Sequence, residues 1–271
     1  MKKGIISIVI AVVAAVTSVS CMGPGKIIKT GDPKLMYSKA LEYYGKEKWS
    51  KASLLFEAVQ HYYIGTTAQD SISFFNARCK FKDRDWDSAS TLLDEFRRQF
   101  GNSVFIEDAE GMYALCFYFM SPQPTRDQTV TSQAIIAITE FMSRYPDSTR
   151  NDDFQKIIDE LTQRLHDKAY INAYTYYKIG RHKSAIVAFK NALKQYPESS
   201  HREEIMYYIV KSSYELAHNS IESKQTDRYL SMLDSYYSFL SEFPESKHLK
   251  ELKRLEKEAK DYMDRNNKEK I

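Results

Sequence analysis

Residues 185–199 read AIVAFKNALKQYPES, and this stretch decides the fold. Small or apolar side chains stand at offsets 0, 3, 4 and 7 from Ala185, and the aromatic Tyr196 stands at offset 11. These spacings place the side chains on one face of an α-helix. Pro197 cannot continue that helix, and Ser199 can cap the next one. The stretch therefore predicts an amphipathic helix that ends at a defined turn.

The same pattern occurs five times along the chain, so this helix belongs to a repeat. The copies begin at Ala52, Ala89, Ala134, Ala185 and Met232, which lie 37, 45, 51 and 47 residues apart. A second apolar stretch of helical periodicity precedes each copy, and the repeating unit is therefore predicted to be a helix pair. These preceding stretches are Leu35–Tyr44, Ile72–Phe81, Ala109–Met120, Ile157–Ile179 and Glu204–Ala217.

The fourth helix pair, with Gly180 at its inner turn, resembles the tetratricopeptide repeat in its small, aromatic and proline positions. A strongly charged helix is expected at Leu249–Met263, where one apolar stripe would cover the end of the array. No segment has the alternation of a strand. We expect an all-α fold, an α-solenoid of about five tetratricopeptide-like helix pairs with a C-terminal capping helix.

The N-terminus has the features of a lipoprotein signal peptide. Lys2 and Lys3 precede an apolar stretch at 5–16, and small residues lead up to Cys21. This arrangement resembles a bacterial lipobox, although Ser18 stands where Leu is usual. We expect residues 1–20 to be cleaved and Cys21 to be lipidated. The alternative is ordinary secretion with an incidental cysteine.

The rest of the chain is expected to fall into three parts. Residues 21–32 would form a flexible tether, residues 33–146 the first three repeats, and residues 147–271 the last two repeats with the capping helix. No acidic pair of the kind that resembles a surface-export signal follows the cysteine, so we expect a lipid-anchored protein on the periplasmic side. Cys79 and Cys116 stand in apolar helical contexts, which favour buried free thiols, and a disulfide between them stays open.

Composition excludes several classes of protein. A mean hydropathy of −0.52 excludes a polytopic membrane protein. The formal net charge of +3 is too small to indicate nucleic acid as a partner. Nucleophile elbows, phosphate-binding glycine loops and dinucleotide fingerprints are absent, and the six histidines do not cluster. We expect no enzyme, no cofactor and no metal; the enzymatic alternative would need His182 and a carboxylate from another repeat.

The mature chain as a whole resembles the BamD family, lipoproteins of the outer-membrane β-barrel assembly machinery. The resemblance rests on residues 49–52 with 56–58, residues 164–177 leading through Gly180 to Tyr196-Pro197, and residues 215–220 with Arg228-Tyr229, the last set being typical of Bacteroidetes-like members. It implies a scaffold that receives unfolded outer-membrane proteins with its N-terminal half. It further implies that the C-terminal half docks on the periplasmic domains of the insertase BamA.

Candidate contact residues follow from repeat position within this resemblance. Tyr37, Tyr44, Phe74 and Phe81 would line the substrate groove, and Tyr177, Lys178, Arg181 and Tyr207 would lie near the BamA contact. A tyrosine-rich cationic face suits an extended peptide, although a solvated helix face explains the same charges. The alternatives are another periplasmic repeat lipoprotein, serving cell division or the peptidoglycan layer, and a glycan-capturing surface lipoprotein, against which the short length speaks.

Overall fold

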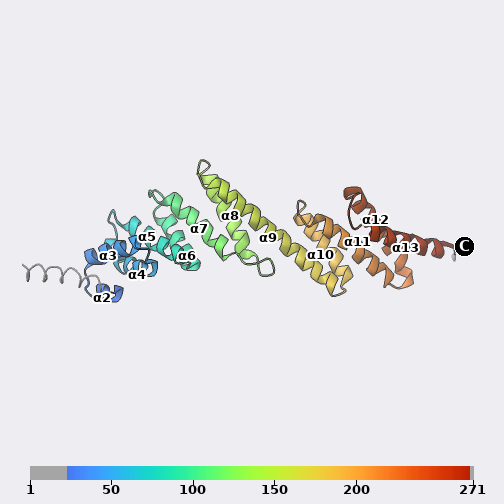
Figure 1. Cartoon of the computed structure of the whole chain (residues 1–271), viewed down its shortest axis with the longest axis horizontal. Coiled ribbons are helices and arrows are strands. Elements are labelled where there is room, and N and C mark those ends of the chain that lie inside the picture. Colours follow the sequence, from blue (N-terminus) through green and yellow to red (C-terminus); the bar gives the residue numbers. More distant parts are fainter. Residues whose placement is uncertain (1–22, 269–271) are drawn as a thin grey trace, which may run out of the picture. The chain divides into compact units, whose positions relative to one another are not determined.

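The computed structural model describes residues 23–268, and all regular secondary structure in this range is helical (Figure 1). The described chain divides into two compact units. The first comprises residues 23–120 and 136–151, and the second comprises residues 121–135 and 152–268. The all-helical prediction is confirmed.

The first unit contains the helices of the first two repeats and most of the third. Its helices are α2 (Pro24–Ile28), α3 (Pro33–Gly45), α4 (Trp49–Val59), the 3₁₀ helix η2 (Gln60–Tyr63), α5 (Gln69–Lys82), α6 (Trp86–Gln99) and α7 (Ile106–Met120). Helix α8 (Thr129–Arg144) begins in the second unit and ends in the first. Consecutive helices from α3 to α7 pack in antiparallel pairs, as a helix-pair repeat requires (Figure 1).

The second unit contains the last two repeats and the cap. Its helices are α9 (Asn151–Lys178), α10 (His182–Gln195), α11 (Arg202–His218), α12 (Glu222–Glu242) and α13 (Leu249–Lys268). The loop after α7 joins this unit because α9 binds it: Arg164 donates to the carbonyl of Ser121 at 3.0 Å, and Lys168 donates to that of Thr125 at 3.1 Å. The partition therefore differs from the expected division after residue 146.

The repeated pattern forms the core of both units. In all five copies the residues at offsets 0, 4 and 7 are at most 4% exposed. In the fourth copy these residues are Ala185, Phe189 and Ala192. The expected capping stripe is also buried, with Leu252, Leu255 and Ala259 packed against α11 and α12. Hydrophobic periodicity thus placed the buried faces of these helices correctly.

One turn closes every repeat. The amide of the residue at offset 14 donates to the carbonyl of the aromatic at offset 11, over 2.9–3.2 Å. The five pairs are Thr66–Tyr63, Ser103–Phe100, Ser148–Tyr145, Ser199–Tyr196 and Ser246–Phe243. The first two turns lack proline and have the same bond, so proline is not needed for the turn.

One local prediction differs from the structure. The tether expected at residues 21–32 is helical over Pro24–Ile28, because Ile27 inserts its side chain among the core residues of the first repeat and is only 1% exposed. The fifth repeat also has a longer second helix: α12 begins 10 residues before Met232, whereas α10 begins 3 residues before Ala185.

Candidate protein-binding surfaces

The candidate groove residues of the N-terminal repeats do not form one surface. Phe74 is 1% exposed and stacks on Phe105 with ring centroids 4.5 Å apart. It is therefore a core residue, and its prediction as a groove residue is wrong, because the helix turns it toward α6 and α7. The sequence could not separate Phe74 from its half-buried neighbour Phe75, since both are apolar and adjacent.

Tyr37 and Tyr44 lie half-buried on α3. The Tyr37 ring is 5.5 Å from the ring of Tyr63, and the Tyr44 ring is 5.0 Å from that of Phe75. Burial raises the pKa of both phenols, so both remain neutral hydrogen-bonding groups at physiological pH. Tyr37 therefore links α3 to η2, at the end of the first repeat, and Tyr44 links α3 to α5 of the second repeat.

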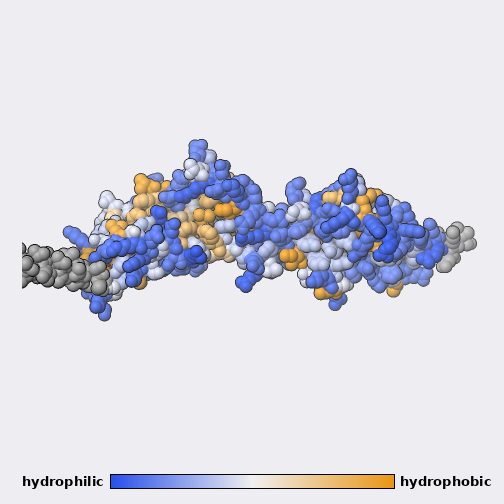
Figure 2. All heavy atoms as spheres, in the orientation of Figure 1, coloured by the Kyte–Doolittle hydropathy of each residue, from blue (hydrophilic) through white to orange (hydrophobic). Residues whose placement is uncertain are grey.

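Phe81 belongs to an aromatic patch of three rings contributed by three helices. Trp86, at the start of α6, lies 5.1 Å from Phe81 and stacks on Phe119 at 4.5 Å. Phe119, at the end of α7, is 47% exposed. Phe119 was not among the predicted contact residues, although its position in an aromatic run near the end of a predicted helix was a usable signal. Apolar side chains gather over the first unit on the face that Figure 2 shows.

Three of the four C-terminal candidates, all except Arg181, lie in a tyrosine–lysine cluster on α9 and α11. The ammonium group of Lys211 lies 6.0 Å from the ring of Tyr177 and 5.3 Å from that of Tyr207. Lys178 lies 5.9 Å from the Tyr174 ring, and Tyr208 packs between Tyr174 and Tyr177 at 4.9 and 4.8 Å. The cluster is therefore defined by Tyr174, Tyr177, Lys178, Tyr207, Tyr208 and Lys211.

The charges of this cluster are set by burial and by α13. Burial, followed by the hydrogen bond to Glu251, raises the pKa of Tyr207 to about 12. Burial opposes the charge on Lys211, but its hydrogen bonds to Glu251 and Tyr207 outweigh burial and raise its pKa. Tyr207 therefore stays neutral and Lys211 stays charged at physiological pH.

Accessibility separates the four C-terminal candidates. Lys178 and Arg181 are exposed and Tyr177 is half-buried. Tyr207 is 6% exposed, and its hydroxyl is engaged by Glu251 at 2.6 Å. Tyr207 is therefore an internal link between α11 and α13, because the capping helix covers the face that the sequence analysis left open.

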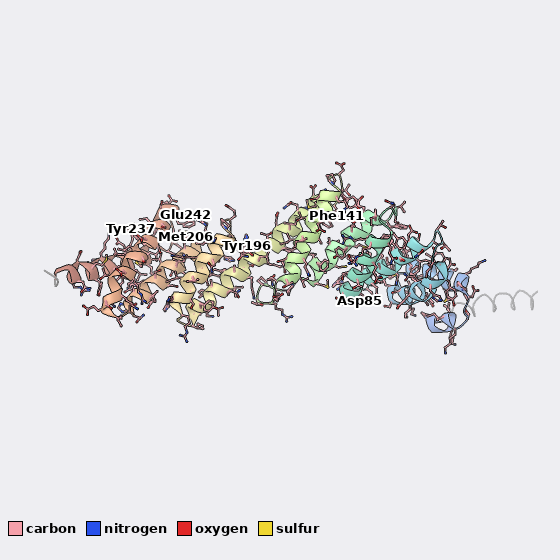
Figure 3. All side chains as sticks on the ribbon, turned by 180° about the vertical axis from the view of Figure 1, so that it is seen from behind. Asp85, Phe141, Tyr196, Met206, Tyr237 and Glu242 are labelled. Atoms are coloured by element: carbon pink, nitrogen blue, oxygen red, sulfur yellow. The ribbon has the colours of Figure 1, made fainter. Side chains whose placement is uncertain are left out.

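A groove of about 360 Å³ lies on a different face of the second unit. Met206 and Ile209 of α11 line it, together with Ser231, Ser235 and Ser238 of α12. Figure 3 labels Met206 among the helices of this unit. Each of the three serine hydroxyls donates to a carbonyl four residues earlier in its own helix. Lys190 and Asp234 also line the groove, so its polar character comes from these two charged side chains and not from the serine hydroxyls.

Residues 23–268 offer few side chains placed for metal binding or catalysis. This range contains no group of three or more His, Cys, Asp or Glu side chains placed to hold a metal ion. Cys79 and Cys116 are buried free thiols, as predicted. His182 packs against Tyr177, and its Nδ1 atom has no hydrogen-bond partner in the described part of the chain. No helix described here combines the length and apolar character needed to cross a bilayer.

Comparison with known proteins identifies the family. Residues 29–228 match the model of YfiO, described as outer membrane lipoprotein. The chain belongs to this family of outer-membrane lipoproteins. The predicted resemblance to the BamD family is also confirmed, because curated proteins named BamD match most of the chain. Cys21 lies outside the described residues.

Two relatives illustrate the match. The outer membrane protein assembly factor BamD of Caulobacter vibrioides is 22% identical over 206 residues, covering 74% of this chain and 68% of that protein. The putative BamD of Aquifex aeolicus is 25% identical over 195 residues, covering 71% and 64%. Among solved structures, the TPR2AB domain of yeast Sti1 in its pHSP90 complex overlays with a TM-score of 0.38 at 11% identity, covering 84% of this chain and 98% of that one.

Proposed function

We propose that this chain is a scaffold of outer-membrane β-barrel assembly, anchored by a lipid on Cys21 and facing the periplasm. The observation that supports this most is the family match over residues 29–228, together with relatives named as outer membrane protein assembly factors. Under this proposal the protein catalyses no reaction. It holds unfolded outer-membrane proteins and docks on a BamA-like insertase.

The aromatic patch is our candidate surface for unfolded substrates. An extended outer-membrane strand alternates apolar and polar residues, and its apolar side chains suit the rings of Phe81, Trp86 and Phe119. The exposed ring of Phe119 can contact such a segment with little rearrangement. Half-buried Tyr37 and Tyr44 would contribute hydroxyl groups nearer the start of the unit.

Lys178 and Arg181, with the half-buried Tyr177, are our candidate docking surface for the insertase. The exposed cations suit an acidic patch, and Tyr and Arg are enriched in protein interfaces. Anchoring to the membrane would keep both partners at the place where insertion occurs and raise their effective concentration without a new contact.

Affinity purification of the tagged, lipidated protein from its own membranes in mild detergent tests the role. We expect to recover a large barrel protein with repeated periplasmic domains. Recovery of only peptidoglycan or cell-division proteins would overturn the proposal and support a different periplasmic scaffold.

Matched variants test the two surfaces separately. Lys178→Glu/Arg181→Glu should reduce recovery of the insertase, whereas Lys183→Glu/Lys194→Glu, which reverses two other exposed lysines of this unit, should not. A photo-reactive residue at Phe119 should cross-link to an unfolded barrel substrate. The same residue at Leu54, which is similarly exposed at 52%, should cross-link much less. Equal behaviour of test and control variants would contradict the assignment.

A further inference from the structure

Helix α2 is positioned to attach the first repeat directly to the membrane. Gly23 is two peptide units from Cys21, and consecutive Cα atoms are about 3.8 Å apart. A lipid on Cys21 would therefore hold Gly23, the N-cap of α2, within about 8 Å of the anchored residue. The place where the anchor meets folded protein is α2 itself, well before α3.

The docking of α2 on the first repeat is specific. Ile27 is buried with Met36 and Ala40 of α3 and with Leu55 and Phe56 of α4. A short, ordered turn then connects α2 to α3. Thr30 donates its hydroxyl to the carbonyl of Ile27 at 2.7 Å, and Gly31 takes the left-handed conformation with φ 68°.

The next residue completes the connection. The carboxylate of Asp32 accepts from the amides of Lys34 and Leu35, at 2.9 and 3.2 Å, and so caps α3. The segment from α2 to the first turn of α3 is thus held in place by the buried side chain of Ile27 and by hydrogen bonds of Thr30 and Asp32. A force on residue 23 would be transmitted to the first repeat.

The outward side of this segment is basic and partly apolar. With Ile27 turned inward, Lys26, Ile28 and Lys29 face outward, since successive residues are rotated by about 100° around a helix. Ile28 is 36% exposed. Neither Lys26, Lys29 nor the exposed Lys34 forms an ion pair with any residue in the 23–268 range. Three free cations and an exposed isoleucine beside a lipid anchor are complementary to anionic headgroups.

We propose that α2 clamps the first repeat to the membrane, with Lys26, Ile28, Lys29 and Lys34 lying on an anionic phospholipid surface. This inference rests on the lipidation of Cys21 under the proposed function. The clamp holds the N-terminal repeats in one orientation at the bilayer. A free 12-residue tether would instead allow an r.m.s. separation of about 19 Å, from about 5.5 Å times the square root of its length.

A fluorescent label on the full lipidated protein tests the clamp. Ser38→Cys places one reactive thiol on the exposed face one turn beyond Lys34, and the buried Cys79 and Cys116 leave it selectively labelled. The protein is reconstituted into equimolar phosphatidylcholine–phosphatidylglycerol vesicles that carry a contact quencher on their headgroups. We expect strong quenching in this mixture and weaker quenching in pure phosphatidylcholine.

Three variants locate the cause of the quenching. Six Gly-Ser residues inserted between Met22 and Gly23 leave α2 docked but lengthen the anchor, and should remove most of the quenching. Lys26→Glu/Lys29→Glu should lower the docked population about fivefold per lysine. Lys183→Glu/Lys194→Glu should leave it unchanged. Ile27→Asp should act like the insertion, with circular dichroism checking that the repeats remain folded.

Two outcomes would overturn the proposal, and they differ in what else they imply. If the mature protein has no acyl chains on Cys21 by intact mass, the anchor of the proposed function fails and the clamp fails with it. If Cys21 is acylated but the insertion and the Lys26→Glu/Lys29→Glu variant quench like the parent protein, only the clamp is wrong.

Discussion

Arg84 occupies in the second repeat the backbone conformation that Gly180 occupies in the fourth. Each residue lies five positions before its repeat's first motif alanine, with φ of 63° and 71°. Glu47 takes the same position in the first repeat, with φ of 55°. In these three repeats the turn between the paired helices uses a left-handed residue, and only the fourth supplies the glycine that adopts it without strain.

Replacing Arg84 by glycine should stabilise the protein. The change removes the left-handed penalty of about 1–2 kcal/mol but adds unfolded-chain entropy, which leaves a gain of about 0.5–1 kcal/mol. Gly180→Ala should have the opposite effect by a similar amount. Urea unfolding of both variants measures the sign of each change in unfolding free energy. Changes of the same sign for Arg84→Gly and Gly180→Ala would contradict the shared turn geometry.

Gly111 should tolerate a methyl group better when Arg150 is removed. A Cβ at Gly111 would overlap Nη1 of Arg150, whose guanidinium pairs with Asp108, and would lie 3.4 Å from the Phe141 ring. Gly45, at the end of α3, has open space. Because alanine favours a helix by about 1 kcal/mol over glycine, Gly45→Ala should be neutral or stabilising.

The expected difference between Gly111→Ala and Gly45→Ala is about 1–2 kcal/mol in unfolding free energy, since overpacking opposes the helix propensity. In an Arg150→Ala background, Gly111→Ala should no longer destabilise. Thermal unfolding of the single and double variants measures this coupling. Additive effects would show that Arg150 does not limit the space at residue 111.

The two buried cysteines should resist alkylation. Burial raises the pKa of both the Cys79 and the Cys116 thiols to about 12, so almost no thiolate exists at neutral pH, and neither side chain is accessible. We expect no reaction with a maleimide in native protein and complete reaction in denaturant, as measured by intact mass. Rapid native labelling of either cysteine would contradict its placement in the core.

His166 should make the protein less stable as the pH falls. Its ring lies 4.8 Å from that of Tyr196, and burial lowers its pKa below 6.5, with smaller opposing and reinforcing effects of Asp167 and His201. The folded state then binds fewer protons than the unfolded state, so its stability is complete above pH 6.5 and declines as the pH falls through that value.

Replacing His166 by phenylalanine should reduce this loss. Chemical unfolding at pH 7.5 and pH 5 compares the parent with His166→Phe, and the exposed His61→Gln serves as the control. The parent and the control should lose more stability between the two pH values than His166→Phe. An unchanged pH dependence in His166→Phe would show that its burial does not govern the titration.

The helices and their buried faces could be predicted because both depend on local spacing. A helix places offsets 0, 4 and 7 on one side whatever surrounds it, so Ala185, Phe189 and Ala192 were assigned to the core without a partner in view. The turn was also readable, although proline proved unnecessary: Ser103 closes it onto Phe100 in a repeat that has none.

The candidate surfaces were predicted less well, because each depends on which helices meet. Phe74 became a core residue through its stacking on Phe105, and Tyr207 became internal once Glu251 of α13 reached its hydroxyl. Tyr177 and Tyr207 are joined by Lys211, and this cluster was not visible in any single stretch of sequence.

Local spacing was therefore sufficient to specify the helix pairs and their turns, since the backbone period alone decides which side chains share a face. Packing between helices decided the rest. It turned the expected tether into a docked helix through Ile27 and placed Phe119 beside Trp86. Whether a side chain is buried depends on which helix packs over it, and the residue spacing within one helix does not specify that neighbour.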